Sequence, residues 1–408
     1  MQITTMLTNR MCNPLGVELG AVPRLSWVIE TKGNEKAGPI PAARVQVALD
    51  SGFNTVLWDS GFREDLDRVA CPVQIALKSR TRYYWRVSLQ TITSETAWFE
   101  TAKLEEPWVA HWISPDFDPA WHPELFSSFS VNKEVNTARC YICGLGLYRL
   151  SINGEKAGDE QLAPGLCAYD KWIPYQTYDV TALLLNGENS LQVALGNGWY
   201  KGRYGISSKR EFHHGGEFAC IAELHITYKD GSTELNYTNT ETWKARRSAI
   251  INSSIFDGEY RDDTLDTEKV YPVKSITIRP ALPIARRAQG IKIMQRLKPK
   301  AVIKTPAGET VLDMGQNMVG WLEFKNRSER GSEIYLQFGE VLQGGNFYRD
   351  NLRSALAEYK YTSDGEEKTV CPRFTFYGFR YVKLTKWPGT VDINDFTGLV
   401  LYSDMRQT

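Results

Sequence analysis

The chain has 408 residues, and its 48 Lys and Arg balance its 48 Asp and Glu, so the formal net charge is zero. This balance excludes a global electrostatic argument for nucleic acid or an anionic membrane as the partner. The length suggests about three domains, and the aromatic content of 12% is high, with 12 Trp and 20 Tyr.

Residues 1–105 consist of short segments that alternate between apolar and polar side chains with a period of two. Gly, Pro, Asn and Ser fill the gaps, and helical periodicity is absent. This pattern predicts a β-sandwich with Trp27 and Trp85 in its core, ending at a boundary near Pro107. The expected strands are Arg24–Glu30, Arg44–Asp50, Val56–Ser60 and Tyr83–Gln90.

Residues 106–278 predict a second sandwich, with strands at Tyr148–Ile152 and Ser190–Leu195. A hairpin is expected around Lys229-Asp230-Gly231, which joins Cys220–Tyr228 to Glu234–Thr238. The single helix expected is Thr181–Leu185. The segment Ser254–Thr264 is acidic, and we expect it to be exposed, with its carboxylates solvated: Asp257, Glu259, Asp262 and Asp263.

The stretch from Leu145 to Gly205 in this second domain combines rings with loop oxygens. Flat rings pack on the C–H groups of a sugar, while amides and carboxylates bind its hydroxyls. The pattern therefore favours a carbohydrate site, although rings in a sandwich are more often core. The rings are Tyr169, Trp172, Tyr175, Tyr178, Trp199, Tyr200 and Tyr204, and the oxygens belong to Asn153, Asp159, Asp170 and Asn197.

Residues 279–408 predict a third unit, with strands at Trp321–Asn326, Glu333–Phe338 and Tyr381–Thr385. Polar residues stand among these strands, and Arg–carboxylate pairs that fix loops to the sheet are their expected role. They are Glu340, Asp350, Asn351, Arg353 and Arg380. The predicted fold class is thus all-β, with three consecutive β-sandwich domains.

Other chemistry finds little support in the sequence. The seven Cys are irregularly spaced, which favours free thiols, and the Cys140/Cys143 pair has no second CxxC for zinc. His213-His214 is expected to be a surface loop rather than a metal site. Because no apolar run has the length of a signal peptide or of a membrane span, a cytoplasmic protein is expected.

Three blocks of sequence resemble the bacterial α-L-rhamnosidases of glycoside hydrolase family 78. Pro23–Trp27 (PRLSW) and Leu57–Gly61 (LWDSG) resemble the fibronectin type III-like domain that opens such enzymes. Leu195–Gly202 (LGNGWYKG) and Phe256–Tyr260 (FDGEY) resemble the galactose-binding-like sandwich. The most specific block resembles the sandwich that precedes the catalytic domain, and includes Leu312–Trp321 (LDMGQNMVGW), Gly339–Leu342 (GEVL), Asn351–Arg353 (NLR) and Phe374–Tyr381 (FTFYGFRY).

The resemblance implies a parent enzyme that hydrolyses terminal α-L-rhamnose with inversion, in an (α/α)₆ barrel that follows the third sandwich. Because this chain stops at Thr408 and shows no run of helices, we expect it to be non-catalytic by itself and transfer no catalytic residue to it. Its expected partners are rhamnose-containing carbohydrate and that catalytic domain.

Some members of the family bind rhamnose on the second sandwich together with calcium. Calcium takes hard oxygen ligands, so the resemblance implies Asp159 and Asn197 as ligands. The sugar would be bound by Asn153, Asp159, Asp170, Trp172, Asn197, Trp199 and Tyr200. Asp159 and Asn197 also suit a plain role in closing loops.

Three functions therefore remain open after the sequence. The first is the accessory, sugar-binding part of an α-L-rhamnosidase. The others are a free-standing carbohydrate-binding module and a scaffold that holds a separately encoded catalytic subunit.

Overall fold

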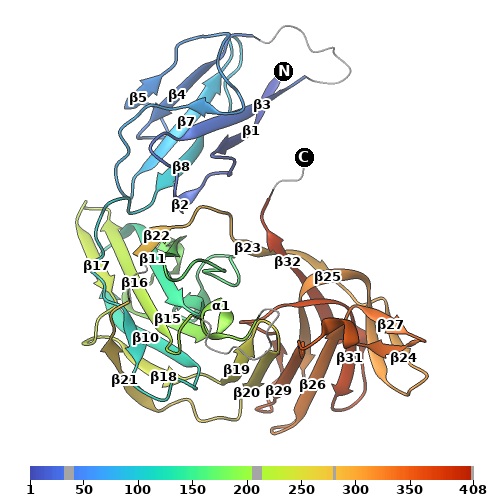
Figure 1. Ribbon diagram of the computed structural model, residues 1–408. Coiled ribbons are helices and arrows are strands. Elements are labelled where there is room, and N and C mark those ends of the chain that lie inside the picture. Colours follow the sequence, from blue (N-terminus) through green and yellow to red (C-terminus); the bar gives the residue numbers. More distant parts are fainter. Residues whose placement is uncertain (32–40, 205–213, 279–281, 406–408) are drawn as a thin grey trace. The chain divides into compact units, whose positions relative to one another are not determined.

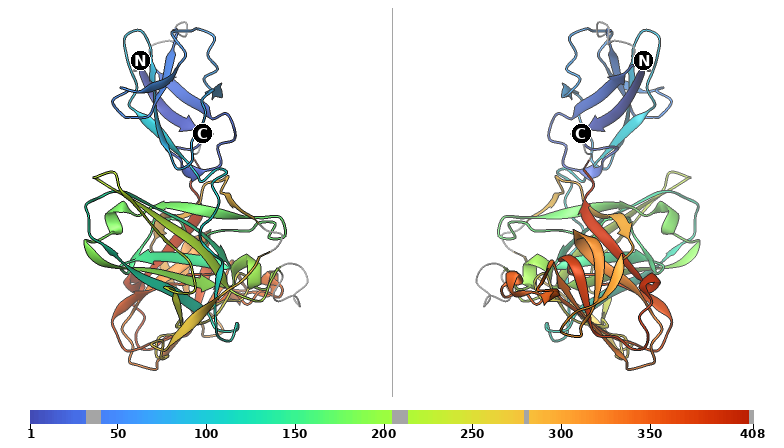
Figure 2. Two further views of the ribbon diagram at one scale, coloured as in Figure 1. Left: turned by 90° about the vertical axis from the view of Figure 1, so that its left-hand side faces the viewer. Right: turned by 90° about the vertical axis from the view of Figure 1, so that its right-hand side faces the viewer.

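The computed structural model describes residues 1–31, 41–204, 214–278 and 282–405 (Figure 1). Within these ranges the fold is all-β, as predicted: the helical elements are one four-residue α-helix and three 3₁₀ helices, and both views in Figure 2 show strands throughout. The helices are α1 (Gly198–Lys201), η1 (Thr181–Leu183), η2 (Asp350–Leu352) and η3 (Ile393–Asp395). None of the described helices has the length and apolar character needed to cross a bilayer.

The first of two compact units contains Met1–Trp108, with the short segments Pro174–Tyr178 and Ile284–Ala288. One sheet has the order β1-β3-β6 and the other β2-β8-β7-β4-β5. Trp27 and Trp85 are buried between the sheets, as predicted. The strands are β1 (Gln2–Thr8), β2 (Leu15–Val17), β3 (Arg24–Glu30), β4 (Arg44–Ala48), β5 (Val56–Asp59), β6 (Cys71–Pro72), β7 (Arg82–Ser88) and β8 (Ala97–Thr101).

The second unit contains Val109–Ile173, Asp179–Pro283 and Gln289–Thr408. Its first sheet runs β13-β12-β15-β10-β18-β21-β9-β16-β11, and β17 pairs with β16. These strands are β9 (Ile113–Pro115), β10 (Pro123–Val131), β11 (Val135–Leu145), β12 (Leu147–Ile152), β13 (Glu155–Lys156), β15 (Gly187–Gly196), β16 (Ala219–Tyr228), β17 (Thr233–Tyr237), β18 (Lys244–Arg247) and β21 (Val270–Ser275). Two further strands, β14 (Trp172–Asp179) and β22 (Leu282–Ala285), contain residues of both units.

The other large sheet of this unit has the order β19-β20-β29-β26-β31-β25-β32-β23, and both β24 and β30 pair with β25. Aromatic and aliphatic residues of this sheet form one continuous core together with residues of the first sheet such as Leu147 and Ala194. The strands are β19 (Ile250–Ser254), β20 (Gly258–Asp262), β23 (Ile291–Leu297), β24 (Ala301–Lys304), β25 (Thr310–Asn326), β26 (Glu333–Gly339), β29 (Glu358–Thr362), β30 (Lys368–Val370), β31 (Tyr377–Lys386) and β32 (Phe396–Ser403). A separate hairpin joins β27 (Val341–Gln343) to β28 (Asn346–Tyr348).

Two local predictions have clear outcomes. The hairpin at Lys229-Asp230-Gly231 is confirmed, with Thr227 opposite Thr233 and Gly231 at φ +83°. The expected helix at Thr181–Leu185 is a 3₁₀ turn of three residues, where the Asp179 carboxylate accepts from the backbone N–H and the hydroxyl of Thr181. The domain boundaries near 105 and 278 remain predictions.

The acidic segment Ser254–Thr264 is not exposed, so that prediction was wrong. Its β19–β20 hairpin belongs to the second large sheet, because β20 pairs in parallel with β29. Ser254 and Glu259 are buried, and the side chain of Asp263 is 5% exposed. The carboxylates are buried because distant parts of the chain supply donors to them.

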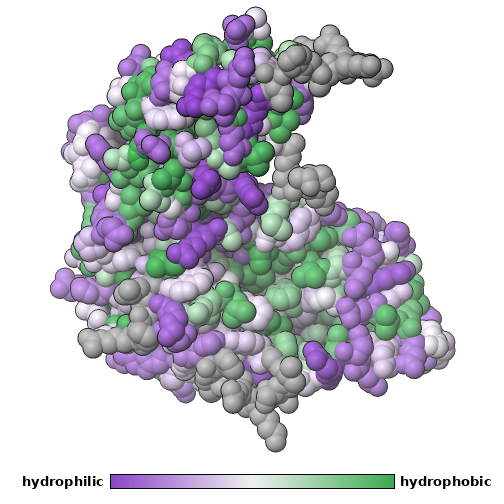
Figure 3. All heavy atoms as spheres, turned by 45° about the horizontal axis from the view of Figure 1, so that its top comes forward, coloured by the Kyte–Doolittle hydropathy of each residue, from purple (hydrophilic) through white to green (hydrophobic). Residues whose placement is uncertain are grey.

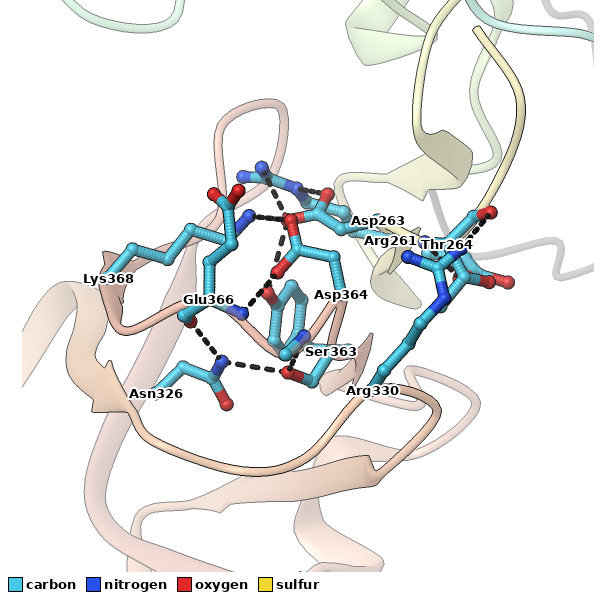
Figure 4. A network of polar contacts seen from close by, with 12 residues as sticks. Arg261, Asp263, Thr264, Asn326, Arg330, Ser363, Asp364, Glu366 and Lys368 are labelled. Carbon is cyan, nitrogen blue, oxygen red and sulfur yellow. Dashed lines mark hydrogen bonds and ion pairs between the residues drawn. The ribbon is translucent and has the colours of Figure 1, made fainter.

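Figure 4 shows the network of hydrogen bonds and ion pairs that surrounds Asp263. Arg261 donates to both of its carboxylate oxygens, at 2.6 and 2.9 Å, and Lys368 lies 2.8 Å away. Lys368 also pairs with Asp364. Burial would raise the pKa of Asp263, but the hydrogen bonds and charges of Arg261 and Lys368 outweigh it and lower that pKa. The network therefore holds the end of β20 against the β29–β30 loop as ionised pairs.

Candidate functional site

Aromatic side chains gather around α1. Tyr169 contacts Tyr200 and His214, with ring centroids 5.2 and 4.8 Å apart. Trp199 meets Tyr204 edge to face at 5.3 Å, and the Tyr204 hydroxyl lies 2.8 Å from Nε2 of His214. We call the set the ring cluster: Tyr169, Trp199, Tyr200, Tyr204, His214 and Phe376, whose ring is 6.3 Å from that of Trp199.

The ring cluster has a buried floor and an accessible rim. Tyr169 is 6% exposed, and burial raises the pKa of its phenol far above the ordinary value, so the hydroxyl stays neutral and donates to the Gly165 carbonyl at 3.2 Å. Trp199, Tyr200 and Tyr204 are half-buried, and His214 is exposed. Figure 3 shows one face of the molecule, on which hydrophilic and hydrophobic residues are interspersed. Half-exposed rings of this kind suit contacts with apolar C–H groups.

A glycine turn places Trp199 and Tyr200. The chain leaves β15 at Gly196 and enters α1 through Gly198, whose φ is +53°. A Cβ on Gly198 would lie 2.5 Å from Cγ of Leu147, so both the backbone conformation and the space require glycine. Asn197 fixes the same turn, because its side-chain amide donates to the Ser253 carbonyl at 2.8 Å.

An ion pair braces the edge of the ring cluster. Nε of Arg203 donates to Asp257 at 3.0 Å, and NH2 of Arg203 donates both to Asp257 and to the Ser354 carbonyl, the latter at 2.9 Å. The two side chains are 14% and 16% exposed. Arg203 therefore ties three segments together, and Asp257 is a structural carboxylate, so the expectation that it is solvated was wrong.

The predicted oxygen ligands each have their own protein partners. Asn153 closes a turn, since its amide nitrogen donates to Leu183 O and Asn189 Oδ1 at 2.9 and 2.8 Å. Asp159 pairs with Lys292 at 3.0 Å, and Asp170 pairs with its neighbour Lys171 at 3.4 Å.

Three of the predicted aromatic rings lie outside the ring cluster. Trp172 is half-buried, and Tyr175 and Tyr178 are buried. Tyr175 contacts Trp108 edge to face, and its hydroxyl accepts from the Lys103 N–H. Of the rings proposed from the sequence, the ring cluster thus keeps Tyr169, Trp199, Tyr200 and Tyr204.

The two residues that the resemblance implies as calcium ligands have separate protein partners, and the calcium site remains a prediction. Asp159 is engaged by Lys292, whereas Asn197 is engaged by Ser253 on β19. Within the described ranges, no three His, Cys, Asp or Glu side chains come together in a way that would hold a metal ion. His214 belongs to the ring cluster, and His213 lies outside the described residues.

Sequence reasoning missed Phe376 and His214 as members of the cluster. Phe376 is 177 positions from Trp199 in the chain (376 − 199), so no local pattern connects them. His214 was assigned to a surface loop, and its exposure agrees, but its ring packs on Tyr169. Only the tertiary fold shows this contact.

Three family models match the chain in order. Residues 3–105 match a Rha78A-like, N-terminal immunoglobulin domain, and residues 133–295 match an α-L-rhamnosidase N-terminal domain. Residues 303–402 match a bacterial α-L-rhamnosidase concanavalin-like domain.

Curated relatives carry the same description. An α-L-rhamnosidase of Streptomyces avermitilis is 35% identical over 76% of this chain and 33% of its own length. One of Alteromonas sp. is 32% identical over 93% of this chain and 44% of its own length. The chain thus spans less than half the length of these relatives.

Solved structures agree with the fold. An α-L-rhamnosidase from Aspergillus terreus superposes with a TM-score of 0.89 at 28% identity, over 100% of this chain and 50% of its own. One from Dictyoglumus thermophilum gives 0.84 at 29% identity, over 99% of this chain and 49% of its own. The S. avermitilis α-L-rhamnosidase complexed with L-rhamnose gives 0.88 at 24% identity, over 99% of this chain and 57% of its own, which speaks for the fold alone.

Proposed function

Because the chain carries the N-terminal domains of the bacterial α-L-rhamnosidase family, we propose that it is the non-catalytic, carbohydrate-binding part of an enzyme that removes terminal α-L-rhamnose from glycans or glycosides. The ring cluster is its sugar-binding surface. The observation that supports this role is the set of half-buried rings around α1, Trp199, Tyr200 and Tyr204, of which Tyr200 packs against the buried Tyr169.

The chemistry of the ring cluster fits a deoxy sugar. L-Rhamnose has a methyl group and a C–H face that pack on a flat ring, and the rims of Tyr200 and Tyr204 end in hydroxyls that can exchange hydrogen bonds with its hydroxyls. Asn153 and Asp170 are not needed for this contact, because the structure places them in a turn and in a neighbouring ion pair.

Replacing Trp199 with alanine is expected to weaken binding of L-rhamnose by about five- to thirtyfold, because the loss of one stacking ring removes on the order of 1–2 kcal/mol. Isothermal titration calorimetry of the whole chain measures this. Trp121→Ala is the matched control, since Trp121 is a half-exposed ring of the same sandwich that packs on Phe117 and Tyr271 instead. Equal losses in both variants, or no heat from the unmodified chain, would refute the assignment.

The chain by itself is expected to release no p-nitrophenol from p-nitrophenyl α-L-rhamnopyranoside above the buffer rate. Asp257, the carboxylate at the edge of the ring cluster, is held by Arg203 as a structural ion pair, whereas an inverting hydrolase needs two opposed carboxyl groups free to act as acid and base. A rate that scales with protein concentration and survives repeated purification would contradict the non-catalytic role.

A further inference from the structure

A second polar cluster lies on the third sandwich, next to the ring cluster. Glu340, which follows β26, accepts one amide hydrogen bond on each carboxylate oxygen: from Asn317 at 3.2 Å and from Asn351 at 2.8 Å. Asn317 and Asn351 are exposed, and Glu340 is half-buried. We call these three residues the Glu340 cluster.

An irregularity in the sheet positions the Glu340 cluster. Between Asp313 and Met318, β25 advances by five positions while its partner β31 advances by two, from Tyr381 to Phe379. The extra residues bulge out of the ladder, with Gly315 at φ +81°, and carry Asn317 outward. Asn351 is contributed by η2.

β31 connects the Glu340 cluster to the ring cluster. Tyr377 and Phe379 are buried, so Phe376 and Gly378 lie on the other, accessible side of the chain. The ring of Phe376 approaches Trp199. A Cβ on Gly378 would lie 3.6 Å from Oε1 of Glu340, so the chain passes beside this carboxylate two residues after Phe376.

The Glu340 cluster keeps capacity for a ligand. A carboxylate offers about four acceptor positions, and among the residues that the structure describes two amides occupy one position on each oxygen. Neither partner is a cation, in contrast to Asp257, Asp263 and Asp313, which Arg or Lys side chains hold. A carboxylate held by exposed amides is a suitable acceptor for sugar hydroxyls.

We propose that the Glu340 cluster is a second saccharide subsite, which binds the sugar residue next to the one on the ring cluster. The inference rests on the proposed function, since it extends that surface along Phe376 and Gly378. The preferred ligand of the chain is then a rhamnose-terminated saccharide of two or more residues. The hydroxyl groups of its non-terminal residue donate hydrogen bonds to Glu340.

The test compares three probes by calorimetry: L-rhamnose, α-L-rhamnopyranosyl-(1→2)-D-glucose and α-L-rhamnopyranosyl-(1→6)-D-glucose. The unmodified chain is expected to bind at least one disaccharide about tenfold more tightly than rhamnose. Glu340→Gln is expected to remove that advantage while changing the affinity for rhamnose by less than about twofold. Glu333→Gln is the control, because Glu333 is an exposed carboxylate of the same sheet, paired with Lys386.

The outcomes separate the two proposals. If rhamnose binds and Trp199→Ala weakens that binding as expected, but the disaccharide advantage is absent or persists in Glu340→Gln, the second subsite is refuted and the ring cluster stands. If Glu340→Gln weakens all three probes equally, the residue acts through the fold and the subsite is again refuted. If the unmodified chain binds none of the probes, both proposals fail. Unfolding curves for each variant show whether the fold is retained.

Discussion

Replacing Gly258 with alanine is expected to lower the apparent melting temperature of the protein by at least about 10 °C, which corresponds to a loss of roughly 4 kcal/mol or more. Gly258 pairs in parallel with Glu358, and an added Cβ would lie 1.7 Å from the Glu358 carbonyl oxygen. Its φ of +106° is also a conformation that residues with a side chain rarely adopt. The β20–β29 ladder must separate to admit the methyl group.

The control for this experiment is Gly308→Ala. Gly308 has a φ of +80°, but nothing lies within 4 Å of an added Cβ, so the substitution costs only the backbone strain of about 1 kcal/mol. Calorimetry or a dye-based melt measures both variants. Similar melting temperatures for the two would show that β20 and β29 do not pair as closely as described.

Glu259→Ala is expected to cost about 3–5 kcal/mol in the free energy of unfolding. Glu259 is fully buried, and its Oε2 accepts from the backbone N–H groups of Arg373 and Phe374 at 3.0 and 2.8 Å. Alanine would leave both donors buried and unpaired, at about 1–3 kcal/mol each, and would open a cavity. Urea unfolding followed by tryptophan fluorescence gives the value, and a loss under about 1 kcal/mol would contradict the role.

Glu259→Gln separates the hydrogen bonds from the charge. Burial raises the pKa of Glu259 above its ordinary value, although the Phe374 and Arg373 amides act against that. A raised pKa in the folded state means that its stabilising contribution is full below the unfolded pKa of about 4.3 and disappears as the pH rises through the folded pKa. Glutamine keeps an acceptor and cannot ionise. The free energy of unfolding of the Glu259→Gln variant, relative to that of the unmodified chain, is therefore expected to increase from pH 4 to pH 8. A difference that stays constant over this range would contradict the argument.

The sequence alone determined the strands and much of the core. Alternation with a period of two is a local property, because neighbouring side chains in a strand point to opposite faces. It therefore located β3 and the burial of Trp27 and Trp85 without knowledge of any partner strand. Trp199 and Tyr200 were predicted as members of a site for a similar reason, since the rings and the loop oxygens lie within the one stretch Leu145–Gly205.

The tertiary structure decided which polar residues are buried and which rings meet. The acidic segment around Glu259 resembled a solvated loop because an isolated carboxylate is costly to bury. Its donors, at Arg373 and Phe374, lie 114 and 115 positions away, so no local pattern could reveal them.

The same separation in the chain hid the surface that we propose for saccharides. Phe376 reaches Trp199 only because β31 begins beside α1, and Glu340 meets Asn317 and Asn351 across a bulge. Sequence patterns record the environment that each residue needs, whereas the packing of the two sheets decides which distant residue provides it.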